Sequence, residues 1–330
     1  MTILVTGGAG YIGSHMVLEL ISHGEKVVIL DNLSTGFRFL VPDNISFIEG
    51  DISDGQLVTQ ILQNHDINAI IHFAGSIIVP ESVEKPLDYY HNNTAKSRDL
   101  IALAIKHGVK HFIFSSTAAV YGIPDESPVN EETRLSPISP YGSSKMMTEI
   151  MLQDAAYAHD FNFVALRYFN VAGADPECRV GQSTTNATHL IKIATAAALG
   201  KRSSVSVFGT DYPTPDGTGV RDYIHVSDLA NAHKLALDYL RSGGTSEIMN
   251  CGYGKGYSVL EVINTVKEVT GTDFSVELVP RRAGDPADLV ANSVKIKDIL
   301  SWKPQFNNLN LIIEHALSWE KSLEKRRPLT

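Results

Sequence analysis

Short apolar runs alternate with longer amphipathic stretches along the first half of the chain. Most of the runs are apolar throughout, which is typical of strands buried on both faces of a parallel sheet. They predict strands at Ile3–Thr6, Lys26–Leu30, Ser46–Glu49, Ala69–Phe73, His111–Ser115 and Phe163–Tyr168. The amphipathic stretches predict helices at Tyr11–His23, Gly55–His65, Asn93–His107 and Tyr141–His159. Strand–helix–strand alternation implies right-handed crossovers, so we expect an α/β fold with a doubly wound parallel sheet.

The pattern becomes less regular after about Asn170. Glycine, proline and aspartate interrupt the stretch Gly209–Gly219, and a last helix is predicted at about Leu309–Leu323. A chain of 330 residues favours two domains of roughly 150 residues each. We therefore expect a first domain at residues 1–171 and a smaller α/β domain at residues 172–330, with some chain returning to the first. Because no low-complexity linker separates them, the two domains should pack closely around a cleft.

Composition narrows the class of protein. Hydrophobic residues make up 43% and charged residues 20%, which excludes a disordered chain, a collagen and a coiled-coil rod. The net charge of −9 argues against a nucleic-acid or anionic-membrane partner. Two cysteines, Cys178 and Cys251, make neither a disulfide framework nor a metal cluster. With no apolar run of membrane-spanning length, we expect a cytoplasmic protein without a bound metal.

A glycine triplet lies between the first predicted strand and the first predicted helix. The spacing of Gly7, Gly10 and Gly13 lets backbone N–H groups approach a pyrophosphate at a helix N-terminus, as in Rossmann-type sheets. Asp31 follows the second strand, where its carboxylate can accept both ribose hydroxyls of an adenosine and would repel a 2′-phosphate. Ordinary turns are the alternative reading of these residues. The combination favours NAD over NADP as the cofactor.

Two further strand ends belong with this site. Asp51 and Ile52 follow the third strand, where an aspartate can bond the adenine amino group. The fourth strand ends at Phe73-Ala74-Gly75, where the small residues let a nucleotide lie against the backbone.

A candidate proton-transfer group follows the fifth strand. That strand runs into Ser115-Ser116-Thr117, and Tyr141 and Lys145 come later on a predicted helix. Residues four apart share a helix face, and an ammonium group beside a phenol lowers the tyrosine pKa towards neutrality. A phenolate at neutral pH is a usable general base, and the Thr117 hydroxyl can bond the same substrate oxygen. A chance Tyr–Lys pair is the alternative interpretation.

At this point the chain resembles the extended short-chain dehydrogenase/reductase superfamily. Four stretches narrow the resemblance to the UDP-glucose (UDP-galactose) 4-epimerases: Tyr168-Phe169-Asn170, Phe208–Thr214, Asp216–Val226 and Arg281–Asp285. The resemblance covers nearly the whole chain. It implies transient oxidation of a UDP-hexose at sugar C4 to a 4-keto sugar, which turns over and is reduced on its other face. It also implies a homodimer, in which the predicted helices Asn93–His107 and Tyr141–His159 form the seam.

The resemblance assigns expected roles to matching positions. Tyr141 would carry the proton, Lys145 would tune Tyr141 and contact the ribose, and Thr117 would be the hydroxyl partner. The NAD residues would be Gly7, Gly10, Tyr11, Ile12, Gly13, Asp31, Asn32, Asp51, Ile52, Phe73, Ala74, Gly75, Asn92, Tyr141, Lys145 and Tyr168. The UDP-sugar residues would be Thr117, Asn170, Leu190, Phe208, Arg221, Tyr223, Arg282 and Asp285. Guanidinium groups match a diphosphate; the alternative reading is that Arg221 and Arg282 are surface ion-pair members.

Some positions depart from the family pattern, and alternative activities remain open. His189 stands where an asparagine is expected, and Ile77 where some members carry a lysine. Leu289 matches a position that walls the hexose pocket, a bulky tyrosine there being associated with exclusion of N-acetyl sugars. Rival activities are a UDP-N-acetylglucosamine or UDP-uronic acid 4-epimerase and a nucleotide-sugar 4,6-dehydratase, which would need an acid where Ala118 and Ala119 follow Thr117. A non-catalytic NAD-sensing protein is the remaining alternative.

Overall fold

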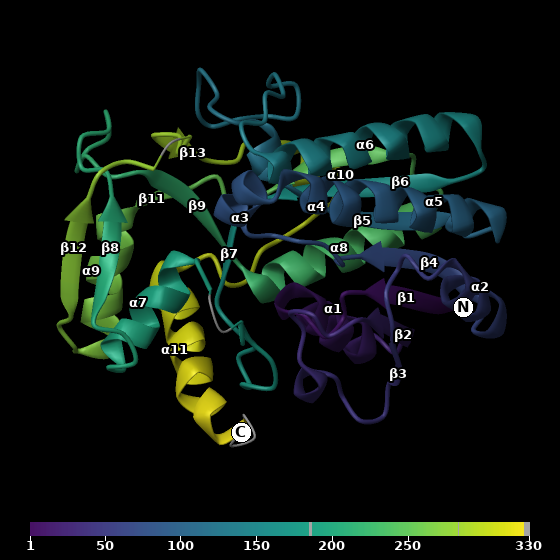
Figure 1. Ribbon diagram of the computed structural model, residues 1–330, viewed down its shortest axis with the longest axis horizontal. Helices are drawn as coiled ribbons and strands as arrows, with labels where there is room; N and C mark the ends of the chain where they lie inside the picture. The colour runs from purple at the N-terminus through teal and green to yellow at the C-terminus, as the bar shows by residue number, and fades with distance from the viewer. Residues whose placement is uncertain (185–186, 283, 327–330) are drawn as a thin grey trace.

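The computed structural model describes residues 1–184, 187–282 and 284–326. Its largest unit is a seven-stranded parallel sheet with the strand order β10-β6-β5-β4-β1-β2-β3 (Figure 1). The strands are β1 (Thr2–Thr6), β2 (Lys26–Asp31), β3 (Ser46–Glu49), β4 (Ile67–His72), β5 (His111–Thr117), β6 (Asn162–Tyr168) and β10 (Glu247–Cys251). The doubly wound parallel sheet predicted from the sequence is confirmed, and its six predicted strands are present within two residues at each end.

Helices cover both faces of this sheet because its strands are apolar on both sides. Ile3 and Val5 of β1 pack in the cluster that contains α1 and α8, whereas Leu4 packs in the cluster that contains α2 and α5. Figure 1 accordingly shows α5 and α6 above the strands and α1 below them. The covering helices are α1 (Tyr11–Ser22), α2 (Gly55–Asn64), α5 (Lys96–Lys106), α6 (Pro140–Ala158) and α8 (Val226–Arg241).

The predicted helix Asn93–His107 is longer and less regular than expected. It is preceded by α3 (Val79–Glu84) and α4 (Pro86–Tyr89), and a π-helical turn over Tyr90–Ala95 joins α4 to α5. The expectation of a start at Asn93 was therefore wrong by several residues. Pro86 begins the helical segment because proline has no N–H to lose at a first turn. Turns of the π type often occur at functional sites.

The rest of the chain forms a second lobe, on the left of Figure 1. It contains a four-stranded sheet in which β9 pairs with β7, β11 and β13, and a two-stranded sheet of β8 and β12. These strands are β7 (Asn170–Ala172), β8 (Ser204–Phe208), β9 (Val220–His225), β11 (Gly256–Ser258), β12 (Ser275–Val279) and β13 (Asp288–Leu289). The helices are α7 (Leu190–Ala198), α9 (Val259–Thr270), α10 (Val294–Leu300) and α11 (Leu309–Arg326).

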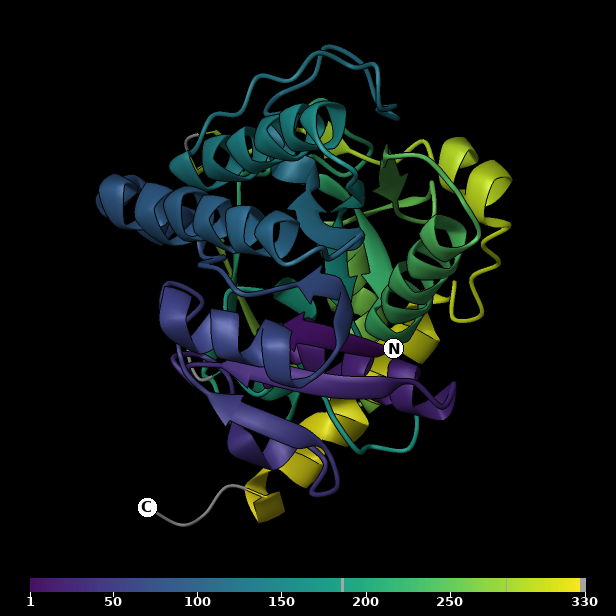
Figure 2. The same cartoon turned by 90° about the vertical axis from the view of Figure 1, so that its right-hand side faces the viewer.

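Between these segments the chain crosses back to the large sheet. Helix α8 packs against α1, and β10 pairs in parallel with β6 along Glu247–Cys251. Figure 2 shows the molecule turned by 90°, so that the right-hand side of Figure 1 faces the viewer. None of the helices in the described ranges is both long enough and apolar enough to cross a bilayer.

Candidate active site

The glycine turn after β1 is built around close backbone contacts. Gly7 has a φ of +73°, and a Cβ atom there would lie 2.7 Å from the Ala74 nitrogen. A Cβ atom on Gly13 would lie 2.1 Å from the Gly7 carbonyl oxygen. Only glycine fits these positions, which leaves the first turn of α1 and the ends of β1 and β4 open to a ligand. This cradle fits the pyrophosphate of a dinucleotide such as NAD.

Asp31 is bound to the same turn. Its Oδ2 accepts the Ala9 N–H at 2.9 Å, and its Oδ1 accepts the Leu33 N–H at 2.8 Å. Burial raises the pKa of Asp31, and these two N–H groups oppose the rise. The carboxylate keeps acceptor capacity for ribose hydroxyls, so the geometry fits the adenosine half of NAD.

Asp51 is already crowded with donors. Its Oδ2 accepts from Asn32 Nδ2 at 2.8 Å and from Lys96 Nζ at 2.9 Å. Its Oδ1 accepts from the backbone N–H and the hydroxyl of Ser53, at 2.9 and 2.6 Å. An adenine amino group would therefore have to share or displace one of these donors. Ile52 beside it is buried.

Thr117, Tyr141 and Lys145 come together at the end of β5. Tyr141 is in the first turn of α6, which Ser139 caps through the Gly142 N–H at 3.2 Å. The Thr117 hydroxyl lies near the Tyr141 hydroxyl and lowers the pKa of Tyr141, and Lys145 Nζ donates to the Ser115 carbonyl oxygen at 2.9 Å. The structure thus places the three predicted catalytic residues in one group.

The electrostatic expectation for Tyr141 was wrong for the free protein. Burial raises the pKa of Tyr141 above its usual value, and only the Thr117 hydrogen bond lowers it. Burial also lowers the pKa of Lys145 to about 8. Removing both groups from water favours their neutral forms, which outweighs the attraction inferred from their spacing.

Several other predicted NAD residues have close contacts or hydrogen bonds that hold them in place. A Cβ atom on Gly75 would lie 3.7 Å from Lys145 Nζ, and Asn92 donates to the Ser76 hydroxyl at 2.9 Å. Tyr168 is hydrogen-bonded to the Ser115 hydroxyl. Tyr11 donates to the Gly173 carbonyl oxygen at 2.7 Å.

The sequence did not indicate a role for Asn93, which joins the segment after β4 to α6. Its Oδ1 accepts the Ser76 N–H at 2.7 Å, and its Nδ2 donates to Ser144 of α6 at 3.1 Å. A buried asparagine in an otherwise amphipathic stretch was the available signal, because such a group needs hydrogen-bond partners.

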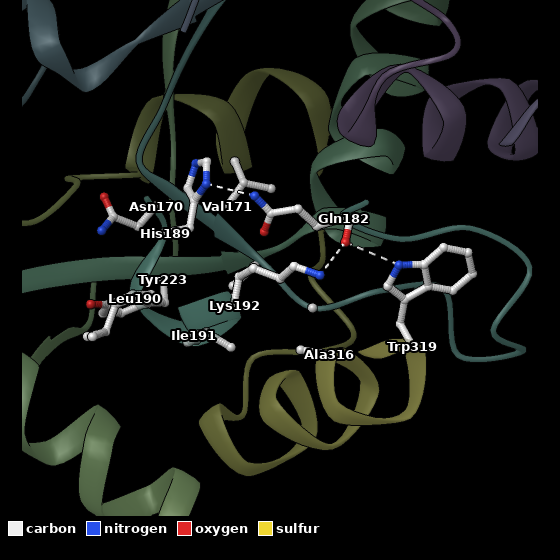
Figure 3. Close-up of a pocket in the computed structure, with 12 residues that line it drawn as sticks. Asn170, Val171, Gln182, His189, Leu190, Ile191, Lys192, Tyr223, Ala316 and Trp319 are labelled. Atoms are coloured by element: carbon white, nitrogen blue, oxygen red, sulfur yellow. Dashed lines mark hydrogen bonds between the residues drawn. The ribbon is translucent and has the colours of Figure 1, made fainter. Parts of the chain in front are cut away.

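The predicted UDP-sugar residues form two groups across the second lobe. Asn170 and Tyr223 are opposite each other in the pairing of β7 with β9, and both line a cavity with Leu190 (Figure 3). The other group contains an ion pair and a cation–π contact. Arg221 lies 3.7 Å from Asp285, and the Arg282 guanidinium lies 3.5 Å from the centroid of the Phe208 ring.

The cavity wall includes residues that the sequence did not suggest. Gln182 hydrogen-bonds His189 at 2.7 Å, and the Gln182 carbonyl oxygen accepts from Lys192 at 2.9 Å and from Trp319 Nε1 at 3.2 Å (Figure 3). Helix α11 therefore holds the segment that carries His189. Ile77, the second departure, is exposed.

Leu289 lies in β13 opposite Arg221 in the strand register. It is buried in a small apolar cluster with Ala118 and Phe169. The position predicted to wall the hexose pocket thus belongs to the same apolar cluster as Ala118, the residue that follows Thr117.

Comparisons with known proteins show the family of the chain. The family model for the NAD dependent epimerase/dehydratase family matches residues 3–252. A UDP-glucose 4-epimerase from Azospirillum brasilense is 54% identical over 323 residues, covering 98% of this chain and 93% of that protein. A crystal structure of a UDP-glucose 4-epimerase superposes with a TM-score of 0.96 at 44% identity, covering 99% of this chain and 100% of that one.

A second solved structure carries ligands. The UDP-glucose 4-epimerase of Bifidobacterium longum, in complex with NAD+ and UDP, has a TM-score of 0.93 and 37% identity, covering 99% of this chain and 100% of that one. The family model matches residues 3–252, and the relatives and structures extend over nearly all of the sequence. The chain therefore belongs to the NAD dependent epimerase/dehydratase family, among its UDP-glucose 4-epimerases.

Proposed function

We propose that the protein interconverts UDP-galactose and UDP-glucose by transient oxidation at sugar C4. The observation that carries the proposal is the grouping of Thr117, Tyr141 and Lys145 at the end of β5. Tyr141 takes the proton of the sugar 4-hydroxyl and later returns it, while Thr117 bonds the same oxygen. Lys145 stabilises the phenolate that forms.

The residues around the glycine turn hold NAD. Gly7, Gly13 and Ala74 form the pyrophosphate cradle, and Asp31 binds the ribose. Bound NAD would supply a hydride acceptor and donor for sugar C4, and a positive charge in addition to that of Lys145. Other members of the predicted set, including Asn92 and Tyr168, line the same site. The bound NAD+ of the Bifidobacterium longum enzyme supports this assignment.

The second lobe holds the nucleotide sugar. Arg221 and Arg282 bind the diphosphate, with Asp285 orienting Arg221. Asn170, Leu190, Phe208 and Tyr223 supply the remaining wall. The 4-keto hexose has to rotate in the site to present its other face. Contacts with the UDP portion therefore supply most of the binding free energy. Residues 1–171 thus form the NAD domain and residues 172–330 the UDP-sugar domain, with α8 and β10 returning to the first.

The protein acts as a cytoplasmic homodimer. Large apolar side chains are exposed on α3, α4 and α6, which pack against one another; they are Val79, Val83, Leu87, Met147, Ile150 and Tyr157. An apolar face of this kind is typical of a protein interface. Among the described residues, the predicted seam segment Asn93–His107 carries none of the exposed large apolar side chains, so the seam is shifted towards α3 and α4.

One assay separates the proposal from its rivals. Purified protein incubated with UDP-galactose should form UDP-glucose without added NAD, and deuterium at sugar C4 should stay in the product. A 4,6-dehydratase would release a 4-keto-6-deoxy sugar instead, which Ala118 and Ala119 after Thr117 disfavour because they cannot transfer protons. Absence of turnover would leave a 4-epimerase of another nucleotide sugar, UDP-N-acetylglucosamine or a UDP-uronic acid, or an NAD-sensing protein.

A further inference from the structure

Two side chains, one helical turn apart, join α6 to the end of β5. Lys145 Nζ donates to the Ser115 carbonyl oxygen at 2.9 Å. Glu149, four residues later, accepts a hydrogen bond from the hydroxyl of the next strand residue, Ser116. Thr117 follows directly in the strand. A slide or a rotation of α6 along the sheet would break both contacts at once.

Glu149 is a buried carboxylate with a fixed partner. It is 1% exposed, and Arg167 of β6 donates to both of its oxygens, with Nε 3.0 Å from Oε1 and Nη2 2.6 Å from Oε2. Burial of such a pair costs so much desolvation free energy that apolar residues of similar volume often give equal stability. The pair instead fixes the orientation of the Glu149 carboxylate, because it leaves Oε1 facing Ser116.

Arg167 is itself held from the other side. Its Nη1 donates to the Tyr121 hydroxyl at 3.0 Å, and that hydroxyl donates to Asn250 Oδ1 at 2.7 Å. The guanidinium also lies 5.1 Å from the centroid of the Tyr121 ring. A chain of contacts thus runs from α6 through β6 to β10, and it leaves the carboxylate of Glu149 one orientation.

The charge of Glu149 acts on the catalytic group as well. Burial lowers the pKa of Lys145 to about 8, and the Glu149 carboxylate opposes this by raising it. Glu149 therefore favours the protonated form of Lys145, which is the form that stabilises a phenolate.

We propose that Glu149 is a positioning residue for proton transfer: held by Arg167, it clamps α6 to Ser116 so that Tyr141 faces Thr117. The inference rests on the proposed function, since the clamp matters only if Tyr141 exchanges a proton with the sugar. It assigns a role to residues that do not contact the substrate, the cofactor or the reacting atoms.

Ser116→Ala is the first test because it removes one hydroxyl and keeps the ion pair. We expect kcat to fall by roughly 10- to 100-fold, the cost of a small misplacement of a reacting group. The KM for UDP-galactose and the NAD content should stay within twofold, and backbone amides in the first turns of α6 should exchange hydrogen faster. A kcat within twofold of the wild-type value overturns the proposal.

Glu149→Gln tests the charge, with Glu247→Gln as the matched control. Glu247 Oε2 lies 2.8 Å from Lys295 Nζ. This ion pair is not part of the catalytic group, so the Glu247→Gln variant should match the wild type. Glu149→Gln should lower kcat and move the alkaline limb of the pH profile to lower pH, because Lys145 then loses its proton more easily. A uniform loss at every pH would indicate a merely structural role and overturn the proposal. If Glu149→Gln does not fold, Ser116→Ala alone decides.

The clamp and the proposed function fail in different ways. A wild-type protein without epimerase activity overturns the proposed function. Hydrogen exchange in α6 of the free protein, compared between the wild type and Ser116→Ala, tests the clamp without any turnover; identical exchange in both overturns it.

Discussion

Lys96 Nζ lies 2.9 Å from Asp51 Oδ2, which joins the start of α5 to the segment after β3. Both side chains are mostly buried, with exposed fractions of 15% and 29%. Hydrogen bonds from Ser53, Lys96 and Asn32 hold the pKa of Asp51 well below its usual range. The carboxylate proposed to face the adenine is therefore ionised and fixed in place by a lysine.

Lys96→Met should weaken NAD binding without affecting the chemical step. Methionine keeps much of the side-chain volume but removes the charge, and Asp51 then loses its ion pair. A pair of this exposure is worth roughly a 2- to 5-fold change in affinity, measurable as the dissociation constant of NAD by calorimetry on stripped protein. Lys85→Met is the control, because Lys85 pairs with the exposed Glu81 at 3.2 Å. Equal affinities in both variants would contradict the role of Lys96.

Tyr141→Phe should fold and retain NAD but lose epimerase activity. The ring stays, so packing survives, and only the proton carrier is removed. The loss should reach at least ~100-fold, the low end for removal of a general acid–base group. Turnover of UDP-galactose is the measurement, with NAD content and thermal unfolding as checks; near-normal turnover would rule out the mechanism.

Acid should destabilise the protein through buried neutral histidines. His233 lies under the rings of Phe73 and Tyr168, and burial lowers its pKa to about 4. The unfolded chain binds a proton at this residue below about pH 6.5 and the folded chain does not. Stability from His233 is therefore fully present above pH 6.5 and is lost as the pH falls towards 4, at about 1.4 kcal/mol per pH unit.

His233→Phe should flatten this dependence. Within the described residues His233 Nε2 has no hydrogen-bond partner, so phenylalanine gives up only the Nδ1 contact to Leu229. Urea midpoints at pH 7 and pH 5 should differ less in the variant than in the wild type. Some dependence should remain, because His15 has its pKa lowered to about 4 as well. An unchanged difference between the two pH values would show that His233 does not titrate on unfolding.

Leu289 should set the tolerance for N-acetyl sugars. It is buried beside Ala118 and Phe169, and leucine fills less space than tyrosine. We expect UDP-glucose and UDP-galactose as main substrates, with slow or no turnover of UDP-N-acetylglucosamine. Leu289→Tyr should abolish any N-acetyl activity while sparing the plain hexoses, as kcat/KM on both substrates will show. Unchanged turnover of N-acetyl sugars would mean that a residue other than Leu289 sets this tolerance.

Ile150→Glu should split the proposed dimer. Ile150 lies on the exposed apolar face of α6 with 47% of its surface exposed, and a buried unpaired charge at an interface is costly. Light scattering should give the mass of two chains for the wild type and of one for the variant. Ile123→Glu is the control, since Ile123 is similarly exposed at 56% outside α3, α4 and α6. Loss of the dimer in both variants, or in neither, would place the interface elsewhere.

The large sheet could be predicted because its signals are local. Apolar runs such as Phe112–Phe114 are buried as a consequence of their own composition, and Gly7 and Asp31 occupy fixed places beside β1 and β2. The seventh strand could not, because the pairing of β10 with β6 joins segments about 80 residues apart and no short pattern encodes it.

The partners of buried charged residues could not be predicted from the sequence either. Arg167 interrupts an apolar strand, which signals that it needs a buried partner. Only the fold brings Glu149 of α6 opposite it. The protonation of Tyr141 was misjudged for a similar reason, since spacing along a helix says nothing about how much water the surrounding layers exclude.

The late arrival of β10 has a consequence for synthesis on the ribosome. Strands β1 to β6 have all left the exit tunnel once Tyr168 has emerged, but α8 and β10 follow only after Val226 and Cys251. Until then β6 is an unpaired edge, and the apolar side of the sheet that α8 later covers faces solvent. The nascent chain therefore passes through a stage in which a nearly finished sheet is open to strand addition by neighbouring chains. A stalled or prematurely terminated product ending near residue 171 should for this reason depend on chaperones, whereas in the full-length chain β10 pairs with β6 and α10 packs against β10.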